Sequence, residues 1–283
     1  MSVNEKMTAI ADAIREKTGN TELLTLDDMA TAIASIKTND TTVEDDLIEN
    51  KRTTYTNDRV TKIAGNIFQN NQYLVEVSFP NVLSVGGSAF GNCPQLTTVN
   101  LPSVTSISGS AFYQSKKVTH VYAPNVVTLG SNAFRTCPMS KIVEFPKLTT
   151  TSTYAFQDCV NIEYLDIGKT TTIGTYTFYN CKNLTALVLR RSDKPVTLSA
   201  PSNAFTGTPI KDGTGYVYVP DDLVDDYKAN SNWSTFAEQI KPMSELVKPE
   251  EEVVALTFSL RNEENLPYDE ESTEIEEEDQ TDD

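Results

Sequence analysis

The residue types that most often perform chemistry are scarce in this chain, and their spacing limits what they can do. All four cysteines lie at one repeated position, three residues after a phenylalanine: Cys93, Cys137, Cys159 and Cys181. If the chain stacks in coils, equivalent positions lie about 4.8 Å apart. That separation permits a disulfide, and a column of thiols could in principle bind a metal ion.

A structural role for the cysteines is the alternative, and the sequence favours it. Asn71 and Ser115 occupy the same position in two other coils, no histidine joins the column, and no C-x-x-C spacing occurs. Small groups at a tight inner corner can satisfy local backbone groups, and free Cys is among the most buried residue types. We therefore expect buried structural cysteines, with no metal and no cofactor.

Catalytic constellations are equally hard to find. A Ser-His-Asp or Cys-His site needs a histidine beside the nucleophile, and the single histidine, His120, lies between the inward-facing Val118 and Val121 of an expected strand. No Walker loop, G-x-G-x-x-G or H-E-x-x-H motif occurs, and no pair of acids is marked out for glycoside cleavage. We predict that the protein is not an enzyme, and a hydrolase is the least favoured class.

Binding chemistry is better represented, on the outward positions of successive expected strands. One column contains Glu76, Thr98, His120, Ile142, Tyr164 and Ala186, and the adjacent column contains Ser78, Asn100, Tyr122, Glu144, Asp166 and Val188. The middle of this continuous face gathers a group that we call the central patch: His120, Tyr122, Glu144, Tyr164 and Asp166. Aromatic rings beside carboxylates suit contacts with a sugar or a protein. The alternative is that these are merely tolerated solvent-facing residues.

The elements that must position these residues come from a strict internal repeat. A phenylalanine recurs every 22 residues, at Phe68, Phe90, Phe112, Phe134, Phe156 and Phe178. A fixed period of this length is the signature of a solenoid. Because each coil contacts only its neighbours, none can bury its apolar residues alone.

Each coil carries a strand with the pattern apolar-x-x-apolar-x-apolar, as in Leu96, Val99 and Leu101. This is the strand pattern of leucine-rich repeats. A corner residue follows the strand: Pro80, Pro102, Pro124 and Pro146, then Gly168 and Arg190. One coil departs from the pattern, because Ser140 replaces its first apolar residue.

The segments around the repeats complete the expected domain organisation. Residues 1–36 read as a helical hairpin for attachment or oligomerisation, or as a cap on the solenoid, and residues 37–58 read as a linker and N-terminal cap with an edge strand at Arg52–Tyr55. We assign 59–211 to the repeats, with a loop at Arg191–Pro201. Residues 212–248 form a C-terminal cap: a strand at Tyr216–Val219, a helix at Asp221–Lys228, and Trp233 in the cap core.

The net charge of −17 is concentrated at the C-terminus. Residues 249–283 hold 15 acidic residues and one arginine, a charge of −14, so the rest of the chain carries −17 + 14 = −3. Such a composition predicts a largely disordered tail. No basic stripe is available for nucleic acid, and no stretch is long and apolar enough for membrane insertion. No Sec signal peptide is visible at Met1, which suggests function inside a cell or release by another route, such as assembly into a particle.

The repeat running from Ala89 and Phe90 through Cys93, Leu96, Val99 and Leu101 to Pro102 resembles the BspA-type (Treponema-type) leucine-rich repeats. The closing segment Tyr218-Val219-Pro220, with Tyr227 and Trp233, is similar to the terminal unit of that family. The resemblance implies a right-handed solenoid of about six or seven coils with one strand per coil. It also implies binding rather than catalysis, in proteins of bacterial surfaces and adhesion.

A second resemblance concerns the N-terminal segment. Residues Ile10–Gly19, Leu24–Ala34 and Leu47–Val60 are similar to a module of tail-associated proteins in phages and prophages of Gram-positive gut bacteria. This implies a virion protein made in the host cytoplasm: a tail fibre, a baseplate-associated protein or a decoration protein. Its first residues would bind other virion proteins, and its repeat face would bind a bacterial surface glycan or protein. We expect a homo-oligomer. The alternative is a BspA-like adhesion module on or from a bacterial cell.

Overall fold

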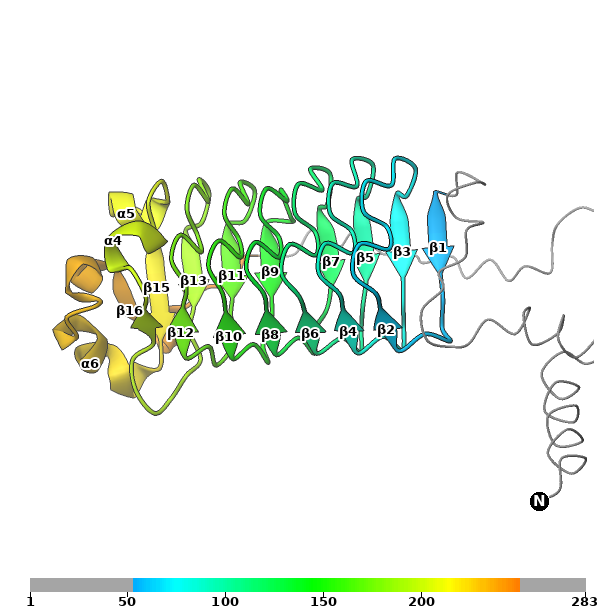
Figure 1. Ribbon diagram of the computed structural model, residues 1–283. Helices are drawn as coiled ribbons and strands as arrows, with labels where there is room; N and C mark the ends of the chain where they lie inside the picture. Colours follow the sequence, from blue (N-terminus) through cyan, green and yellow to red (C-terminus); the bar gives the residue numbers. More distant parts are fainter. Residues whose placement is uncertain (1–52, 250–283) are drawn as a thin grey trace, which may run out of the picture. The chain divides into compact units, whose positions relative to one another are not determined.

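The structure is a computed structural model of the chain, and it describes residues 53–249 (Figure 1). The sequence predictions for residues 1–52 and 250–283 lie outside the described residues. They concern the N-terminal helical hairpin, most of the linker that follows it, and the acidic tail.

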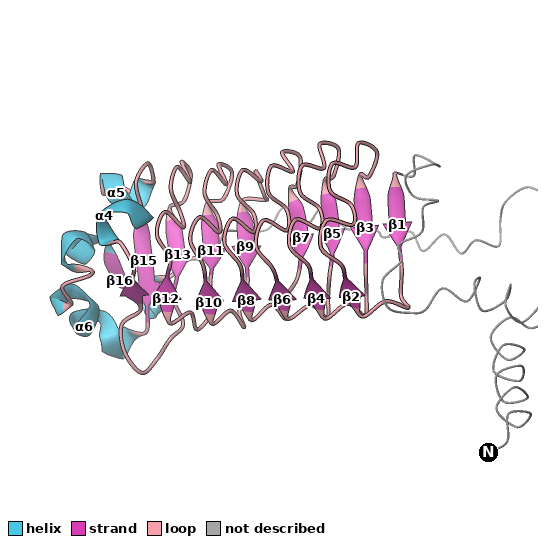
Figure 2. Cartoon of the chain, viewed as in Figure 1, coloured by secondary structure: helices cyan, strands magenta, loops and turns pink. Residues whose placement is uncertain are grey.

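The repeats form a solenoid in which each coil contributes a longer strand to one face and a two-residue strand to another (Figures 1 and 2). The longer strands are β1 (Thr54–Thr56), β3 (Glu76–Ser78), β5 (Thr98–Asn100), β7 (His120–Tyr122), β9 (Ile142–Glu144), β11 (Tyr164–Asp166), β13 (Ala186–Val188), β15 (Tyr216–Val219) and β16 (Ile240–Pro242). The shorter strands are β2 (Lys62–Ile63), β4 (Ser84–Val85), β6 (Ser106–Ile107), β8 (Thr128–Leu129), β10 (Thr150–Thr151), β12 (Thr172–Ile173) and β14 (Thr197–Leu198). All strand pairs are parallel and join equivalent positions of adjacent coils, as in Thr98 with His120.

The repeated phenylalanines form a continuous ladder inside the solenoid. Phe68, Phe90 and Phe112 are stacked with ring centroids 4.9 and 5.2 Å apart. The ladder continues through Phe178 to Phe205 at 5.5 Å, although 27 residues separate these two in sequence. The longer interval is therefore an insertion outside the core, and the stacking repeats across it.

The turns on either side of each phenylalanine require an unusual backbone. In the six coils from Phe68 to Phe178, the residues two positions before and two positions after the phenylalanine have positive φ, as in Asn66 (62°) and Asn70 (63°). Asparagine tolerates this left-handed region better than most residues. The Asn70 amide then donates to the carbonyl of Gly91 in the next coil at 2.9 Å. These turns hold each phenylalanine inward and connect the coils along the loop edge.

The four cysteines are buried free thiols, as the structural interpretation predicts. Each Sγ donates to the carbonyl oxygen of the phenylalanine 25 residues earlier, for example from Cys137 to Phe112 at 3.0 Å. Ser115 makes the same contact from the same column, with its Oγ 2.6 Å from the Phe90 oxygen. Burial raises the pKa of Cys93 and of Cys181 to about 12. The column therefore ties coils together as neutral thiols.

The expectation of one continuous sheet face is wrong, because the longer strands form two sheets. One sheet has the order β1-β3-β5-β7 and the other β16-β15-β13-β11-β9, and no strand pairing joins β7 to β9. The cause is Met139, which has φ 52° and donates its amide to the Val118 oxygen at 2.9 Å. The buried Met139 supplies the apolar side chain that Ser140 lacks. The irregular coil therefore shifts its backbone and loses the ladder.

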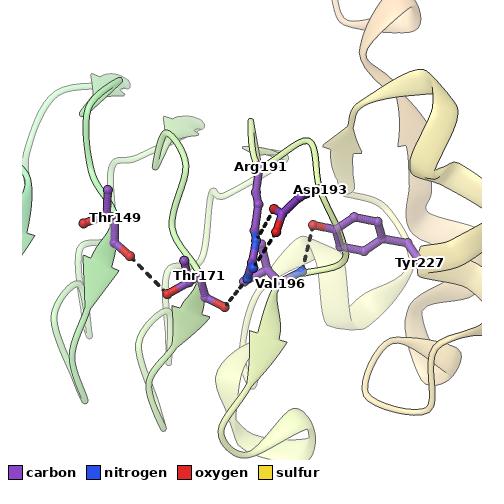
Figure 3. Close-up of polar contacts among 6 residues, drawn as sticks. All are labelled: Thr149, Thr171, Arg191, Asp193, Val196 and Tyr227. Atoms are coloured by element: carbon purple, nitrogen blue, oxygen red, sulfur yellow. Dashed lines mark hydrogen bonds and ion pairs between the residues drawn. The ribbon is translucent and has the colours of Figure 1, made fainter.

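The Arg191–Pro201 segment, predicted as a loop, contains strand β14, which pairs with β12. Its first part is held by polar contacts (Figure 3). The Arg191 guanidinium pairs with Asp193, its Nε lying 2.7 Å from Oδ1, and it also donates to the Thr171 oxygen at 3.3 Å. The insert is thus fastened to the preceding coil.

The C-terminal cap has the predicted strand and helix, and Trp233 is in its core. The short helices α4 (Pro201–Ala204) and α5 (Pro209–Asp212) precede strand β15. After β15 the cap contains η1 (Asp221–Leu223), α6 (Val224–Ala229), η2 (Ser234–Gln239) and η3 (Met243–Glu245). Trp233 is fully buried, and its Nε1 donates to the Val196 oxygen at 2.7 Å. The Val196 amide donates to the Tyr227 hydroxyl at 3.0 Å. The cap covers the last coil through these side chains.

The predicted N-terminal edge strand is β1, displaced to Thr54–Thr56 and paired with β3. Its Tyr55 ring packs against Phe68, with centroids 5.8 Å apart, and against Phe79 at 5.4 Å. An aromatic side chain from β1 thus covers the first rung of the phenylalanine ladder.

Candidate binding face

The solvent side of the longer strands, which we call the outer face, carries the central patch. His120 and Tyr122 lie on β7, at the edge of the first sheet, and the Tyr122 side chain is 50% exposed. Glu144 lies on β9, and Tyr164 and Asp166 lie on β11, in the second sheet. The break between β7 and β9 therefore divides the central patch into two parts.

Tyr164 is at the predicted outward position, but it is only 1% exposed. The Nζ of Lys248 lies 5.9 Å from the centroid of its ring. Burial raises the pKa of Tyr164, and the nearby carboxylates of Asp166 and Glu144 add to this rise. The ring is thus covered in this structure, unlike that of Tyr122.

Asp166 is also buried, because it organises the corner that replaces proline in this part of the solenoid. Its Oδ1 accepts the Gly168 amide at 2.8 Å, and its Oδ2 accepts Nε of Arg190 at 2.6 Å. Gly168 has φ 55°, and a Cβ there would lie 2.5 Å from the Pro146 oxygen. Gly168 and Arg190 occupy the corner positions that are proline in four earlier coils, so Asp166 is engaged within the fold.

A segment from the far end of the chain reaches the central patch. We call residues 246–249, which follow η3, the strap. Lys248 Nζ lies 2.9 Å from the Glu144 carboxylate, 104 residues away in sequence. Lys248 thereby brings the strap, which follows β16 and η3, back to β9 and β11 of the same sheet.

The outer face extends further than the sequence analysis predicted. Tyr216 and Tyr218 of β15 continue the two outward columns, with ring centroids 6.4 Å apart. The Nζ of Lys241 lies 5.6 Å from the Tyr216 ring centroid and 3.2 Å from the Glu245 carboxylate. The alternation Tyr-Val-Tyr-Val in the predicted strand is the sequence signal that places both tyrosines on the outer face. The C-terminal part of the face is therefore richer in aromatic and cationic groups.

A second aromatic cluster, also missed, lies beside the phenylalanine turns. The Arg135 guanidinium is 5.6 Å from the Tyr113 ring centroid and 5.3 Å from that of Tyr154, and Tyr154 stacks on Tyr176 at 5.2 Å. Arg135 Nε and Gln157 Oε1 are buried and have no hydrogen-bond partner within residues 53–249. Arg135 thus occupies one face of the Tyr113 ring and one face of the Tyr154 ring.

Other kinds of site find little support between residues 53 and 249. This part of the chain contains no group of three or more His, Cys, Asp or Glu side chains placed to hold a metal ion. Within the same range, no helix has the length and apolar character needed to cross a bilayer. What the geometry offers is an extended surface of tyrosines, carboxylates and lysines.

Comparisons with known proteins agree with this architecture. The family model described as BspA type Leucine rich repeat region (6 copies) matches residues 41–148 and 105–216. A solved leucine-rich repeat protein of T. pallidum is 22% identical with a TM-score of 0.50, and the alignment covers 56% of this chain and 77% of that chain.

Two other solved structures align less closely. A leucine-rich repeat protein of Bacteroides ovatus is 21% identical with a TM-score of 0.42, covering 58% of this chain and 44% of that one. A leucine rich cell surface protein of Faecalibacterium prausnitzii is 23% identical with a TM-score of 0.39, covering 50% and 48%. No curated protein shows significant similarity to the chain. The family match covers all of the repeats, and the chain belongs to the BspA-type leucine-rich repeat family.

Proposed function

We propose that this protein is a non-catalytic binding protein that uses its outer face for adhesion at a bacterial surface. The observation that carries the proposal is the contrast between the two sides of the longer strands. Inward positions repeat apolar residues from coil to coil, whereas the outward columns change residue type at nearly every coil. Stacking accounts for the repeating positions, so specificity falls to the varying ones.

The exposed part of the central patch is the place where a ligand would make contact. Tyr122 offers a half-exposed ring with a polar tip, a combination common at binding surfaces. His120 lies beside it on β7, and Glu144 is exposed on β9. Tyr122 and His120 on one side of the break and Glu144 on the other offer an aromatic ring and hydrogen-bonding groups, suited to a glycan or a protein that spans the break.

Replacement of Tyr122 by alanine tests this proposal. We expect the variant to lose most of its binding to intact cells of Gram-positive gut bacteria, measured with fluorescently labelled protein by flow cytometry. Leu83→Ala is a matched control, because Leu83 is also exposed but lies next to the shorter strand β4. If Tyr122→Ala and Leu83→Ala bind cells as well as the unmodified protein does, the outer face is not the adhesive surface.

The finer role that we propose is a virion protein attached through its N-terminal segment. The motivation is the likeness of Ile10–Gly19, Leu24–Ala34 and Leu47–Val60 to tail-associated proteins. In this role the repeats face outward and the first residues bind other virion proteins, as part of a homo-oligomer. Co-purification with particles in a density gradient is the test. A protein found only on cells, never with particles, contradicts the virion role and favours a BspA-like cell-surface adhesion protein.

A further inference from the structure

The strap shows what chemistry the outer face accepts. Among the contacts that Lys248 makes within residues 53–249, two place its ammonium group: the Glu144 carboxylate, 2.9 Å away, and the Tyr164 ring, whose centroid is 5.9 Å away. A cation near an aromatic face is attracted by the ring quadrupole, and the carboxylate adds an ion pair. The two strands β9 and β11 are paired, with Tyr164 opposite Ile142. A carboxylate and a ring from adjacent coils therefore form one cation-binding site.

The surroundings favour a single positive charge at this place. Asp166 is already neutralised by Arg190 at 2.6 Å, so Glu144 is the carboxylate left to pair with an incoming cation. The Arg190 pairing also keeps Asp166 turned toward the corner at Gly168. The site that Lys248 occupies thus consists of the Glu144 carboxylate and the Tyr164 ring on two paired strands.

The contact between strap and face is of a kind that can be displaced. The side chains of Lys248 and Glu144 are 41% and 36% exposed, and ion pairs with this degree of exposure contribute little to stability because solvent screens them. An intramolecular competitor nevertheless acts at an effective concentration in the millimolar range when its linker is short. The strap therefore occupies the site when no partner is present, and a competing segment can displace it.

We propose that Glu144 and Tyr164 form a recognition site for a lysine-bearing, extended segment of a partner protein, and that the strap occupies this site as a built-in competitor. This inference rests on the proposed function, because it names the chemical class of partner for the same face. The partner segment binds as the strap does, with its lysine between the carboxylate and the ring. Binding at Glu144 then requires release of Lys248.

The test uses a peptide copied from the chain, Ser-Glu-Leu-Val-Lys-Pro, which is residues 244–249. With one glutamate and one lysine its side chains have no net charge, so the acidic tail does not attract it indiscriminately. Its affinity is measured by isothermal titration calorimetry against full-length protein and the Lys248→Ala variant. We expect the variant to bind at least threefold more tightly, because the competing lysine is gone.

Matched substitutions locate the binding. In the Lys248→Ala background, adding Glu144→Gln is expected to weaken peptide binding at least threefold, and replacing the lysine of the peptide by alanine should have a similar effect. Glu163→Gln in the same background is the control, since Glu163 is a neighbouring carboxylate that pairs with Lys141 at 3.5 Å. That substitution should leave peptide affinity unchanged.

Three results overturn the inference: equal affinity of the unmodified protein and Lys248→Ala, no effect of Glu144→Gln, or no binding to Lys248→Ala at about 1 mM peptide, the scale of the intramolecular competitor. These outcomes differ from failure of the proposed function. If the peptide binds as expected but labelled protein does not bind cells, lysine recognition stands and the adhesive role falls. If cells are bound and Glu144→Gln changes nothing, the partner uses another part of the face.

Discussion

Asp166 illustrates how a residue in a repeat acquires a new task when its neighbours change. Four coils turn after the longer strand with a proline, whose ring fixes φ and removes an amide that would need a partner. In the coil with Gly168 that amide is present, and the Asp166 carboxylate accepts it at 2.8 Å. In the following coil Arg190 pairs with the same carboxylate. A group that the sequence places on a binding surface thereby becomes part of the corner.

Replacement of Asp166 by alanine should therefore reduce stability. Its side chain is 2% exposed and accepts two hydrogen bonds, one of them from a cationic donor. Loss of hydrogen bonds to charged groups costs about 1.5–3 kcal/mol, and partial exposure of Arg190 favours the lower part of this range. Urea unfolding measures the change. Asp193→Ala, which removes a 65% exposed carboxylate from its pair with Arg191, should have a much smaller effect. Equal effects would contradict the corner role.

The cysteine column should make stability depend on pH in the alkaline range. Burial disfavours the thiolate, so the folded pKa of Cys93 and of Cys181 is raised from 9.0 to about 12. The stabilisation is complete below pH 9, where thiols are protonated in both states, and is lost as pH rises toward 12, because only the unfolded chain releases the protons. Each such thiol contributes a slope of about 1.4 kcal/mol per pH unit in that window.

Urea unfolding between pH 8 and 10.5 under reducing conditions tests this. The free energy of unfolding should be flat near pH 8 and fall above 9. Cys93→Ser should fold, since Ser115 already occupies the same column and bonds to Phe90. Its free energy of unfolding should fall less steeply with pH than that of the unmodified protein, by the slope of one thiol. A Cys93→Ser slope identical to that of the unmodified protein would mean that the Cys93 thiol does not contribute.

At the scale of the structural element, the sequence predicts the repeating coil well. Identical spacing placed every phenylalanine, cysteine and corner residue in its column, because the same side chain in the same register must meet the same environment in the next coil. Local exceptions were less predictable. Ser140 indicated a weak coil, but only the backbone of Met139 reveals that the strand pairing is lost there. A pattern of apolar positions records which residues are buried, not which backbone bonds form.

Removal of one ring from the phenylalanine ladder should destabilise the solenoid. Phe134 stacks on Phe112 at 5.1 Å and on Phe156 at 6.0 Å, and it is fully buried. Phe134→Ala should cost about 3–5 kcal/mol, as cavities left by buried aromatic residues generally do. Thermal and urea unfolding measure this loss. Leu83→Ala, an exposed truncation, should stay within about 0.5 kcal/mol. A small effect of Phe134→Ala would mean that the coils do not share one core.

At the scale of the whole molecule, the strap and the division of the outer face depend on contacts that sequence spacing does not encode. Lys248 meets Glu144 across 104 residues, and no repeat links the two positions. The columns that predict the central patch require an uninterrupted sheet, and neither the burial of Tyr164 nor the break between β7 and β9 follows from them. The columns themselves are correct: Tyr164 lies opposite Ile142 and Ala186, as alignment on the phenylalanine requires. Sequence spacing therefore predicts which residues share a column, but not whether a strand pairing is lost or a later segment covers part of that column.

The break between β7 and β9 should be visible in hydrogen exchange of the intact protein. The His120 amide donates to Thr97 at 3.0 Å and the Tyr164 amide donates to Lys141 at 2.9 Å, both across coils. The equivalent bond from Ile142 to Thr119 is missing among the described residues, since β7 and β9 belong to different sheets. Amides without an inter-coil partner exchange through smaller local openings. Ile142 should therefore exchange faster than His120 and Tyr164, measured by NMR or by mass spectrometry with fragmentation.

Equal protection of Ile142, His120 and Tyr164 would mean that the two sheets join in solution, which would bring Tyr122 and Glu144 into adjacent strands. With the break present, the two parts of the central patch lie on separate sheets, and a ligand that contacts both must bridge them. Such a ligand should slow exchange at Ile142, whereas a lysine-bearing segment bound only at Glu144 and Tyr164 should leave His120 unchanged. Exchange at these three amides thus separates binding across the break from binding on the second sheet alone.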